Sequence, residues 1–252
     1  MTITKKLLGG IAFGAFLAGP ALAADLPARV PVKAPPAVVT QYNWGGFYIG
    51  GHVGYGWGDT EWGFVNTPAA PTFTDFRLKG IVGGVHTGYN WQFDRWVLGI
   101  EGSVSATKMD GSTLCPNAAF RCEADVDHFW RAGVRAGMTA GATGNWLFYA
   151  TGGFARAKLD TRTPVVATGA NTASAGNHHH GWFGGAGIEW GVAPNFTVGI
   201  EAYHVSLGAE RHFLPNGAVV PTFTRDVDLD FTVALARATY KFNWGAPVIA
   251  RY

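Results

Sequence analysis

The sequence of 252 residues predicts an all-β fold, an eight-stranded antiparallel up-and-down transmembrane β-barrel. Three observations predict it: apolar residues alternate with small or polar ones along eight segments, the connections alternate between short and long, and charges favour one face of each segment. The composition agrees with this fold. The chain has 36 glycines and is 48% hydrophobic, yet beyond its N-terminus it has no apolar run of about 18 residues that would form a membrane helix.

The charge content excludes two other classes of protein. Charged residues make up only 14% of the chain, which is too few for a disordered charged tail. The formal net charge of +2 gives no field strong enough to attract nucleic acid. We therefore expect no nucleic-acid partner.

The N-terminus reads as an export signal. Lys5 and Lys6 precede an apolar stretch, and Ala21-Leu22-Ala23 is a small-residue cleavage site, so residues 1–23 are predicted to be a signal peptide. Residues 24–43 are rich in proline and are predicted to be an extended periplasmic segment with no core of its own. The barrel is expected over residues 44–242, followed by a C-terminal extension over residues 243–252.

The first alternating segment shows the pattern clearly. Phe47, Val53 and Trp57 fall on one parity, whereas Gly50 and His52 fall on the other, so one face is apolar and the other is almost bare. The further strands are predicted at residues 76–91, 95–107, 125–139, 146–159, 180–191, 196–208 and 226–242. Such segments exceed the roughly 9 to 11 residues that a tilted strand needs to cross a bilayer.

The connections separate into two kinds. Residues 92–94, 140–145 and 192–195 are short turns, and residues 58–75, 108–124, 160–179 and 209–225 are predicted to be long loops. This asymmetry is typical of outer-membrane barrels, whose short turns face the periplasm. Aromatic residues gather at the short-turn end and predict a girdle at the lipid headgroups: Trp44, Trp91, Trp96, Trp146, Trp190, Phe196, Phe242 and Trp244. A water-soluble sandwich with these rings in its core is the alternative, but it does not require them to gather beside the turns.

Charge placement predicts which face lines the lumen. A cation facing lipid at the bilayer midplane costs about 2 to 4 kcal/mol, so the charged parity should point inward. The charges expected to form a network across the narrow lumen are Glu101, Arg131, Arg135, Glu189, Glu201 and Arg237. The same face is predicted to hold Arg156, Lys158, Lys241, His52, His86 and Asn90. In the fifth strand this choice also turns Phe148 and Phe154 inward, so one of those rings should lie outside the hydrocarbon layer.

The two cysteines point to a disulfide. Cys115 and Cys122 enclose six residues, and in an oxidising compartment such a pair most simply closes a loop. Zinc would need two further ligands, and no nearby histidine pair supplies them.

The remaining polar residues give little evidence for a catalytic site or for a metal or haem site. Acidic residues at the predicted strand ends have no serine or cysteine nucleophile in a recognisable motif beside them, which argues against an enzyme. These residues are Asp110, Glu123, Asp125, Asp127, Asp226, Asp228 and Asp230, with His128.

The run His178-His179-His180 is predicted to be a solvated loop edge. Because neighbouring side chains of an extended chain point to opposite faces, only His178 and His180 could share a metal or haem. A third ligand would have to come from His128, His204 or His212. No cofactor is expected.

Several motifs occur in an order that resembles the alphaproteobacterial major outer-membrane protein family, which is grouped with the OmpA-like and opacity-like eight-stranded barrels. They are Asn43-Trp44-Gly45-Gly46-Phe47-Tyr48-Ile49-Gly50, Gly88-Tyr89-Asn90-Trp91-Gln92, Tyr149-Ala150-Thr151-Gly152-Gly153-Phe154-Ala155 and Tyr240-Lys241-Phe242-Asn243-Trp244-Gly245. The resemblance implies an abundant surface barrel that supports envelope integrity and surface contact. Adhesion, haem binding and porin-like activity are the specific roles proposed within the family.

The sequence thus predicts a non-enzymatic outer-membrane barrel with structural and surface-interaction roles and a lumen largely closed by charged side chains. The alternatives are a porin-like channel for small solutes or ions, and a surface protein that binds haem or metal. Expected partners are outer-membrane lipids with lipopolysaccharide, the outer-membrane assembly machinery, and host or surface ligands of the long loops. Phe242 resembles the C-terminal assembly signal, but Tyr252 also ends the chain on an aromatic residue.

Overall fold

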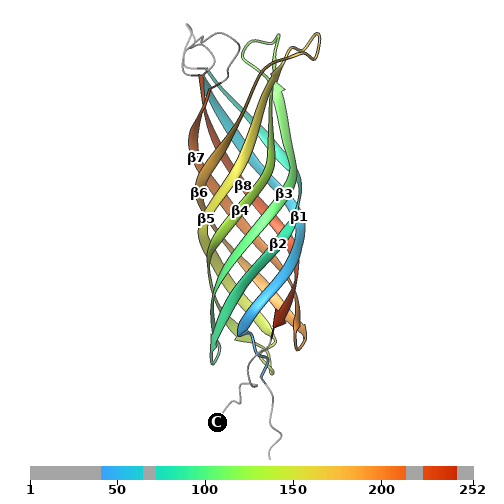
Figure 1. Ribbon diagram of the computed structural model, residues 1–252, viewed down its shortest axis with the longest axis vertical. Coiled ribbons are helices and arrows are strands. Elements are labelled where there is room, and N and C mark those ends of the chain that lie inside the picture. Colours follow the sequence, from blue (N-terminus) through green and yellow to red (C-terminus); the bar gives the residue numbers. More distant parts are fainter. Residues whose placement is uncertain (1–40, 65–71, 214–223, 243–252) are drawn as a thin grey trace, which may run out of the picture. The chain divides into compact units, whose positions relative to one another are not determined.

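The computed structural model describes residues 41–64, 72–213 and 224–242, which form a closed barrel of eight antiparallel strands paired in chain order (Figure 1). The strands are β1 (Gly46–Phe64), β2 (Thr72–Phe93), β3 (Trp96–Leu114), β4 (Arg121–Ala140), β5 (Trp146–Pro164), β6 (Asn171–Ala193), β7 (Phe196–Phe213) and β8 (Thr224–Phe242). Pairing of β1 with β8 closes the barrel. The predicted fold class is confirmed.

Some predicted segments lie outside the described residues. They are the signal peptide at residues 1–23, residues 24–40 of the proline-rich segment, the extension at residues 243–252, and with it Trp244 and Tyr252. No helix in the described part of the chain is long and apolar enough to cross a membrane.

The strands are longer than predicted. They contain 18 to 23 residues, and the additional residues continue the ladders at the end opposite the short turns. Much of the predicted loops at residues 58–75, 108–124, 160–179 and 209–225 is therefore strand, which corrects their extent. Backbone pairing does not need an apolar outer face, so the ladder continues where the alternation of apolar residues has already ended.

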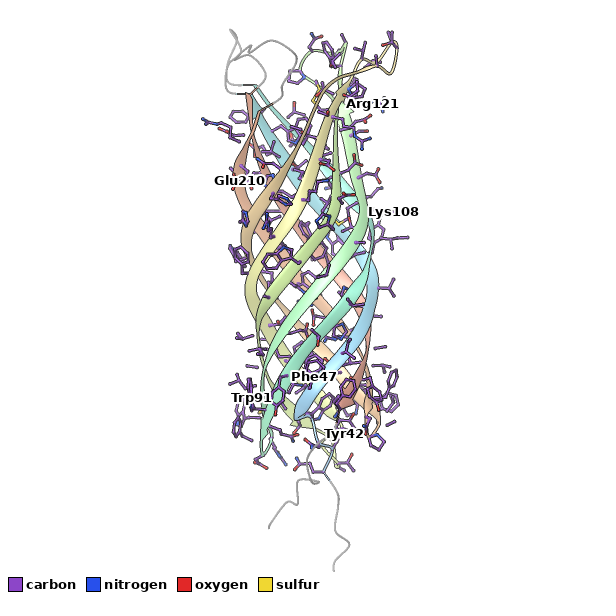
Figure 2. All side chains as sticks on the ribbon, viewed as in Figure 1. Tyr42, Phe47, Trp91, Lys108, Arg121 and Glu210 are labelled. Atoms are coloured by element: carbon purple, nitrogen blue, oxygen red, sulfur yellow. A yellow bond between two sulfur atoms is a disulfide. The ribbon has the colours of Figure 1, made fainter. Side chains whose placement is uncertain are left out.

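The outer face carries the predicted girdle, with one exception among the girdle residues that the structure describes. Trp91, Trp96, Trp146 and Trp190 are 41–62% exposed on the outer face beside the short turns, and Figure 2 shows Trp91 at the same end as Tyr42 and Phe47. Trp44 was assigned wrongly, because its side chain is completely buried. It lies in the mouth of the barrel, where its ring packs with Val97, Leu147 and Tyr149.

The face assignment of β5 was also wrong. Phe148 and Phe154 are both well exposed on the outer face, and Arg156 and Lys158 share their parity, whereas Ala155 and Leu159 point inward. Charge parity predicts an inward face only where the charges lie at membrane depth. Arg156 and Lys158 come after the last lipid-facing ring, where an outward charge meets water or headgroups at little cost.

A bulge in β4 reverses the alternation within one strand. The register with β5 shifts between Val126 and His128, so that Asp127 and His128 are both exposed while Val126 and Phe129 are both buried. A bulge inserts one unpaired residue and so moves the following side chains to the other face.

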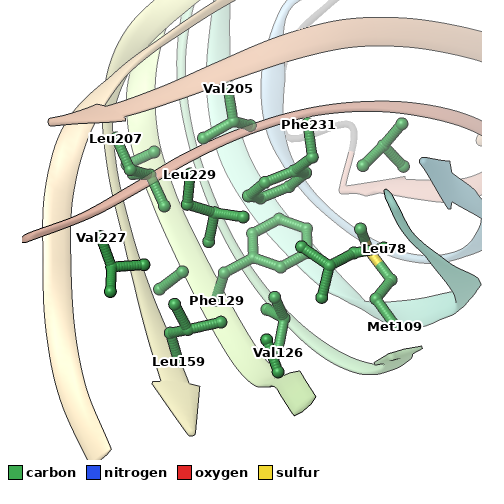
Figure 3. Close-up of a cluster of buried hydrophobic side chains, with 14 of the residues drawn as sticks. Leu78, Met109, Val126, Phe129, Leu159, Val205, Leu207, Val227, Leu229 and Phe231 are labelled. Carbon is green, nitrogen blue, oxygen red and sulfur yellow. The ribbon is translucent and has the colours of Figure 1, made fainter. Parts of the chain in front are cut away.

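The lumen has two chemically different levels. The level nearer the short turns contains charged and polar side chains, and the other level is a cluster of buried apolar side chains that includes Leu78, Phe129, Leu159, Leu229 and Phe231 (Figure 3). This apolar level was not predicted. Its residues have the inward parity of their strands, but they bear no charge that would have drawn attention to them.

Candidate functional site

Six charged side chains meet inside the barrel and form what we call the lumen charge cluster: Glu101 of β3, Arg131 and Arg135 of β4, Glu189 of β6, Glu201 of β7 and Arg237 of β8. Each of these side chains is at most 6% exposed. Strand alternation turns all six inward at similar heights, because each faces away from the apolar outer residues on either side of it.

Glu101 lies at the centre of the cluster. Its carboxylate accepts contacts from all three arginines, at 3.3 Å from Arg131, 3.4 Å from Arg135 and 2.6 Å from Arg237. The hydroxyl of Tyr48 donates a further hydrogen bond to Glu101, at 2.9 Å. One carboxylate thus links β1, β3, β4 and β8 across the lumen.

The other two carboxylates complete the network. Glu189 lies 2.7 Å from Arg135 and 3.4 Å from Arg237. Glu201 lies 2.5 Å from Arg131 and also pairs with Arg237. Three positive and three negative charges therefore neutralise one another at one level of the lumen.

Aromatic and hydroxyl groups surround these charges. Tyr149 donates a hydrogen bond to Glu201 at 2.5 Å and lies below the guanidinium of Arg135, 3.9 Å from ring centroid to Cζ. Tyr203 stacks on Arg131 at 4.2 Å. Ser103 accepts from Arg131 at 3.0 Å, and Thr197 donates to Glu189 at 3.0 Å. These contacts offset part of the desolvation cost of the buried charges.

Tyr149, Tyr203, Ser103 and Thr197 were not predicted from the sequence as partners of these charges. Tyr203 and Ser103 share the parity of the predicted charges, so the alternation that located Glu201 and Glu101 would also have located them. Tyr149 was hidden by the wrong face assignment of β5, which placed Phe148 inside the barrel instead.

A pair of buried histidines lies beside the lumen charge cluster. His52 and His86 approach with their Nδ1 atoms 3.3 Å apart, and their Nε2 atoms lie 2.9 Å from the hydroxyls of Ser105 and Thr239, respectively. Asn90 is buried at the same end and donates to the carbonyl of Trp44 at 3.2 Å. All three predicted inward polar residues thus point into the lumen.

Lys241 is inward but does not join the charge cluster. Its ammonium donates to the carbonyl of Asn43 and lies 3.9 Å from the ring centroid of Tyr42 and 5.2 Å from that of Trp44. Among the described residues Lys241 forms no ion pair with a carboxylate, although it lies on the inward face as predicted. A carbonyl dipole and two ring faces stabilise this cation instead.

The chain before β1 crosses the short-turn mouth of the barrel, and we call residues 41–45 the mouth segment. Tyr42 donates its backbone N–H to Thr143 at 2.8 Å and its hydroxyl to the carbonyl of Ala193 at 3.0 Å. The indole N–H of Trp44 donates to the carbonyl of Gly144 at 2.8 Å. The mouth segment is therefore hydrogen-bonded to the β4–β5 turn and to the end of β6 beside the β6–β7 turn.

The cysteines lie at the far end of the β3–β4 hairpin. Cys115 and Cys122 form a disulfide with their Cα atoms 5.2 Å apart, and both side chains are buried. The bond joins Cys115, which follows the last ladder pair of Leu114 with Arg121, to Cys122, which pairs with Thr113 within the ladder.

The histidine run lies within β6 and not on a loop edge, which corrects its predicted setting. His179 is buried inside the barrel, 3.3 Å from the carbonyl of Gly208, whereas His178 and His180 are exposed on the outer face. Lys158 stands between His128 and His178 in the strand register. Within the described ranges no group of three or more metal-ligating side chains gathers.

The acidic candidates lie on three strands, β3, β4 and β8. Asp110, Asp125 and Asp160 are register neighbours on β3, β4 and β5, and Asp226 is paired with Arg211 at 2.9 Å. Directly opposed like charges are unfavourable, and an exposed ion pair contributes only about 0 to 1 kcal/mol.

Comparison with known proteins agrees with this geometry. The model of the outer membrane protein beta-barrel domain matches residues 11–243. The 31 kDa outer-membrane immunogenic protein of Brucella melitensis is 31% identical over 77% of this chain and 84% of its own length. The 22 kDa outer membrane protein of Rhizobium leguminosarum bv. viciae is 26% identical, over 74% of this chain and 73% of its own length.

A solved structure shares the fold. The outer membrane protein OprG of Pseudomonas aeruginosa superposes with a TM-score of 0.54 at 12% identity, over 80% of this chain and 98% of that protein. The family match and the alphaproteobacterial relatives together show that the chain belongs to the outer membrane protein β-barrel family and is a protein of the Gram-negative outer membrane.

Proposed function

We propose that the protein is a non-enzymatic structural barrel of the outer membrane whose lumen is closed to solutes. The observation that carries this proposal is the lumen charge cluster, six side chains that are each at most 6% exposed. The interior of an eight-stranded barrel is just wide enough for side chains to fill. Three arginines that pair with three glutamates at one level leave little room for a hydrated ion.

Two further layers support closure. Above the cluster lie buried apolar side chains, among them Phe129, Leu229 and Phe231, which offer no polar group to a permeating ion. At the other side the mouth segment spans the opening, with Trp44 completely buried. A solute would have to displace all three layers in turn.

The proposed partners follow from the orientation of the two ends of the barrel in the membrane. We place the short turns in the periplasm and the long hairpins outside the cell, as expected for outer-membrane barrels. The hairpins are then the surface that host or environmental ligands meet, in agreement with the name of the Brucella relative, an outer-membrane immunogenic protein. Lipids with lipopolysaccharide surround the wall, and the assembly machinery inserts a chain exported through residues 1–23.

Liposome swelling tests the proposal against the channel alternative. Refolded protein in liposomes should admit small sugars and amino acids no faster than protein-free liposomes. An outer-membrane porin under the same conditions is the positive control. Swelling with wild-type protein that depends on solute size would overturn the closed-lumen proposal and favour a porin-like channel.

A further inference from the structure

Five side chains that the lumen does not use gather on the outer face of β4, β5 and β6. They are His128 on β4, Arg156 and Lys158 on β5, and His178 and His180 on β6; we call them the basic patch. Arg156 is the register neighbour of His180, and Lys158 is the neighbour of both His128 and His178. The bulge in β4 turns His128 to this face.

The exposed aromatic side chains between the patch and the short turns show where the patch lies relative to the bilayer. On β5 the outer face runs from Trp146 to Phe154, and on β6 from Trp190 to Trp182. Each stretch contains nine residues, which matches the roughly 9 to 11 that cross the hydrocarbon at a tilt. Phe154 contacts Trp130 at 5.6 Å between ring centroids and is paired with Trp182, so these three rings mark the upper boundary.

Arg156 and His180 come directly after this boundary. Arg156 follows Phe154 by two residues on the same face, and the ring of His180 lies 5.9 Å from that of Phe154. Side chains at this height stand beside the headgroups of the outer leaflet and no longer beside acyl chains.

The charges of the patch are incompletely neutralised. Lys158 pairs with Asp160 at 3.0 Å and with Asp127 at 3.3 Å, and both carboxylates lie on its side away from the rings. Among the described residues no ion pair involves Arg156, and its buried Nε has no hydrogen-bond partner. A guanidinium without an ion-pair partner at headgroup height suits an anion that presents several acceptor oxygens.

We propose that the basic patch binds a phosphate group of lipopolysaccharide in the outer leaflet. Arg156 donates to the phosphate oxygens, Lys158 adds a second positive charge beside it, and the exposed histidines add ring N–H donors. The acyl chains then pack on Trp130, Phe154 and Trp182. This site deepens the proposed function, because it rests on the orientation that places the long hairpins outside the cell.

The test measures lipid binding in neutral detergent, where neither conductance nor orientation matters. Native mass spectrometry counts lipid bound to refolded protein during titration with diphosphoryl lipid A, phosphate-free lipid A or inorganic phosphate. Diphosphoryl lipid A should bind at least about tenfold more tightly than the phosphate-free form, because only its phosphate can form the charge-assisted contact with Arg156. Inorganic phosphate should not compete at equal concentration, because it lacks the acyl chains.

Variants then locate the site. Arg156→Gln should weaken binding of diphosphoryl lipid A by about tenfold, and Arg156→Gln with Lys158→Gln should weaken it further. Arg162→Gln is the matched control, with the same charge change on the same strand but farther from the rings, and it should bind as wild type does. Equal binding of the two lipid A forms, or wild-type affinity in the double variant, would overturn the proposal, and so would competition by inorganic phosphate. If a variant does not refold, the comparison of the two lipids on wild-type protein still decides.

Discussion

Glu101 contacts every arginine of the lumen charge cluster. Its two carboxylate oxygens face three guanidinium groups, at 2.6 to 3.4 Å, and Arg237 in turn contacts all three glutamates. Buried ion pairs of this kind contribute little over an apolar filling, yet the loss of one partner is costly because it leaves an uncompensated charge. The cluster is therefore sensitive to single substitutions.

Glu101→Ala is expected to lower the free energy of unfolding by about 3 to 5 kcal/mol, the usual cost of breaking a buried pair. The measurement is equilibrium unfolding of the refolded barrel in urea. Lys108→Ala is the control, a charge on the outer face of β3 that should change stability by less than about 1 kcal/mol. Equal midpoints for the two variants would show that Glu101 is not part of a packed network.

Trp44→Ala should also destabilise the barrel, by about 3 to 5 kcal/mol, because it leaves a cavity in the mouth and removes the hydrogen bond to Gly144. The ring is completely buried. Trp91→Ala, at a ring that is 42% exposed on the outer face, is the matched control and should cost less. Thermal or urea unfolding of the two variants side by side measures the difference. A larger loss for Trp91→Ala would mean that the mouth segment is not an integral part of the fold.

At the scale of the strand, alternation predicted most faces but not all. It placed Glu101, Arg131 and Glu201 on the inward parity, where the structure has them. It misplaced Arg156 and Lys158, because alternation alone does not say where along β5 the membrane ends. It also could not reveal the bulge at Asp127, since one inserted residue leaves no mark in composition.

The β3–β4 hairpin carries a prediction about its thiols. Because Cys115 and Cys122 are joined, protein taken from the envelope and alkylated before reduction should carry no label, and it should carry two labels after reduction. Mass spectrometry of the intact chain counts the labels. Two labels without reduction would mean that the bond does not form in the exported protein.

The hairpin between β5 and β6 tests the proposed orientation. An epitope inserted between Ala167 and Thr168 should be stained by antibody on intact cells, whereas the same epitope between Asp94 and Arg95, in the β2–β3 turn, should be stained only after permeabilisation. Staining of the turn epitope on intact cells would reverse the orientation.

For the whole molecule, the sequence predicted the barrel but only part of what fills it. Charged residues on an otherwise apolar pattern are conspicuous, so the lumen charge cluster could be anticipated. The apolar level around Phe129 and Leu229 could not, because apolar residues on both faces of a strand do not reveal which face is inside. The mouth segment was missed because Tyr42 and Asn43 follow a run of prolines and belong to no alternating pattern.

These layers make closure a property of the whole barrel. A charged level, an apolar level and a crossing segment lie in series, so the resistance to ions should exceed that of any single layer. Removal of one layer should leave the others in place, and the conductance of a single variant should remain small beside that of a porin.

Single-channel recording in planar bilayers decides whether the lumen is closed to ions. Wild-type protein should leave the bilayer silent, and Glu101→Ala should raise the ionic conductance above that baseline, because it removes the carboxylate that joins all three arginines. Lys108→Ala should remain as silent as wild type. Steady openings of the wild-type protein, at a conductance that Glu101→Ala does not change, would show that the lumen is open and that the charge cluster does not close it.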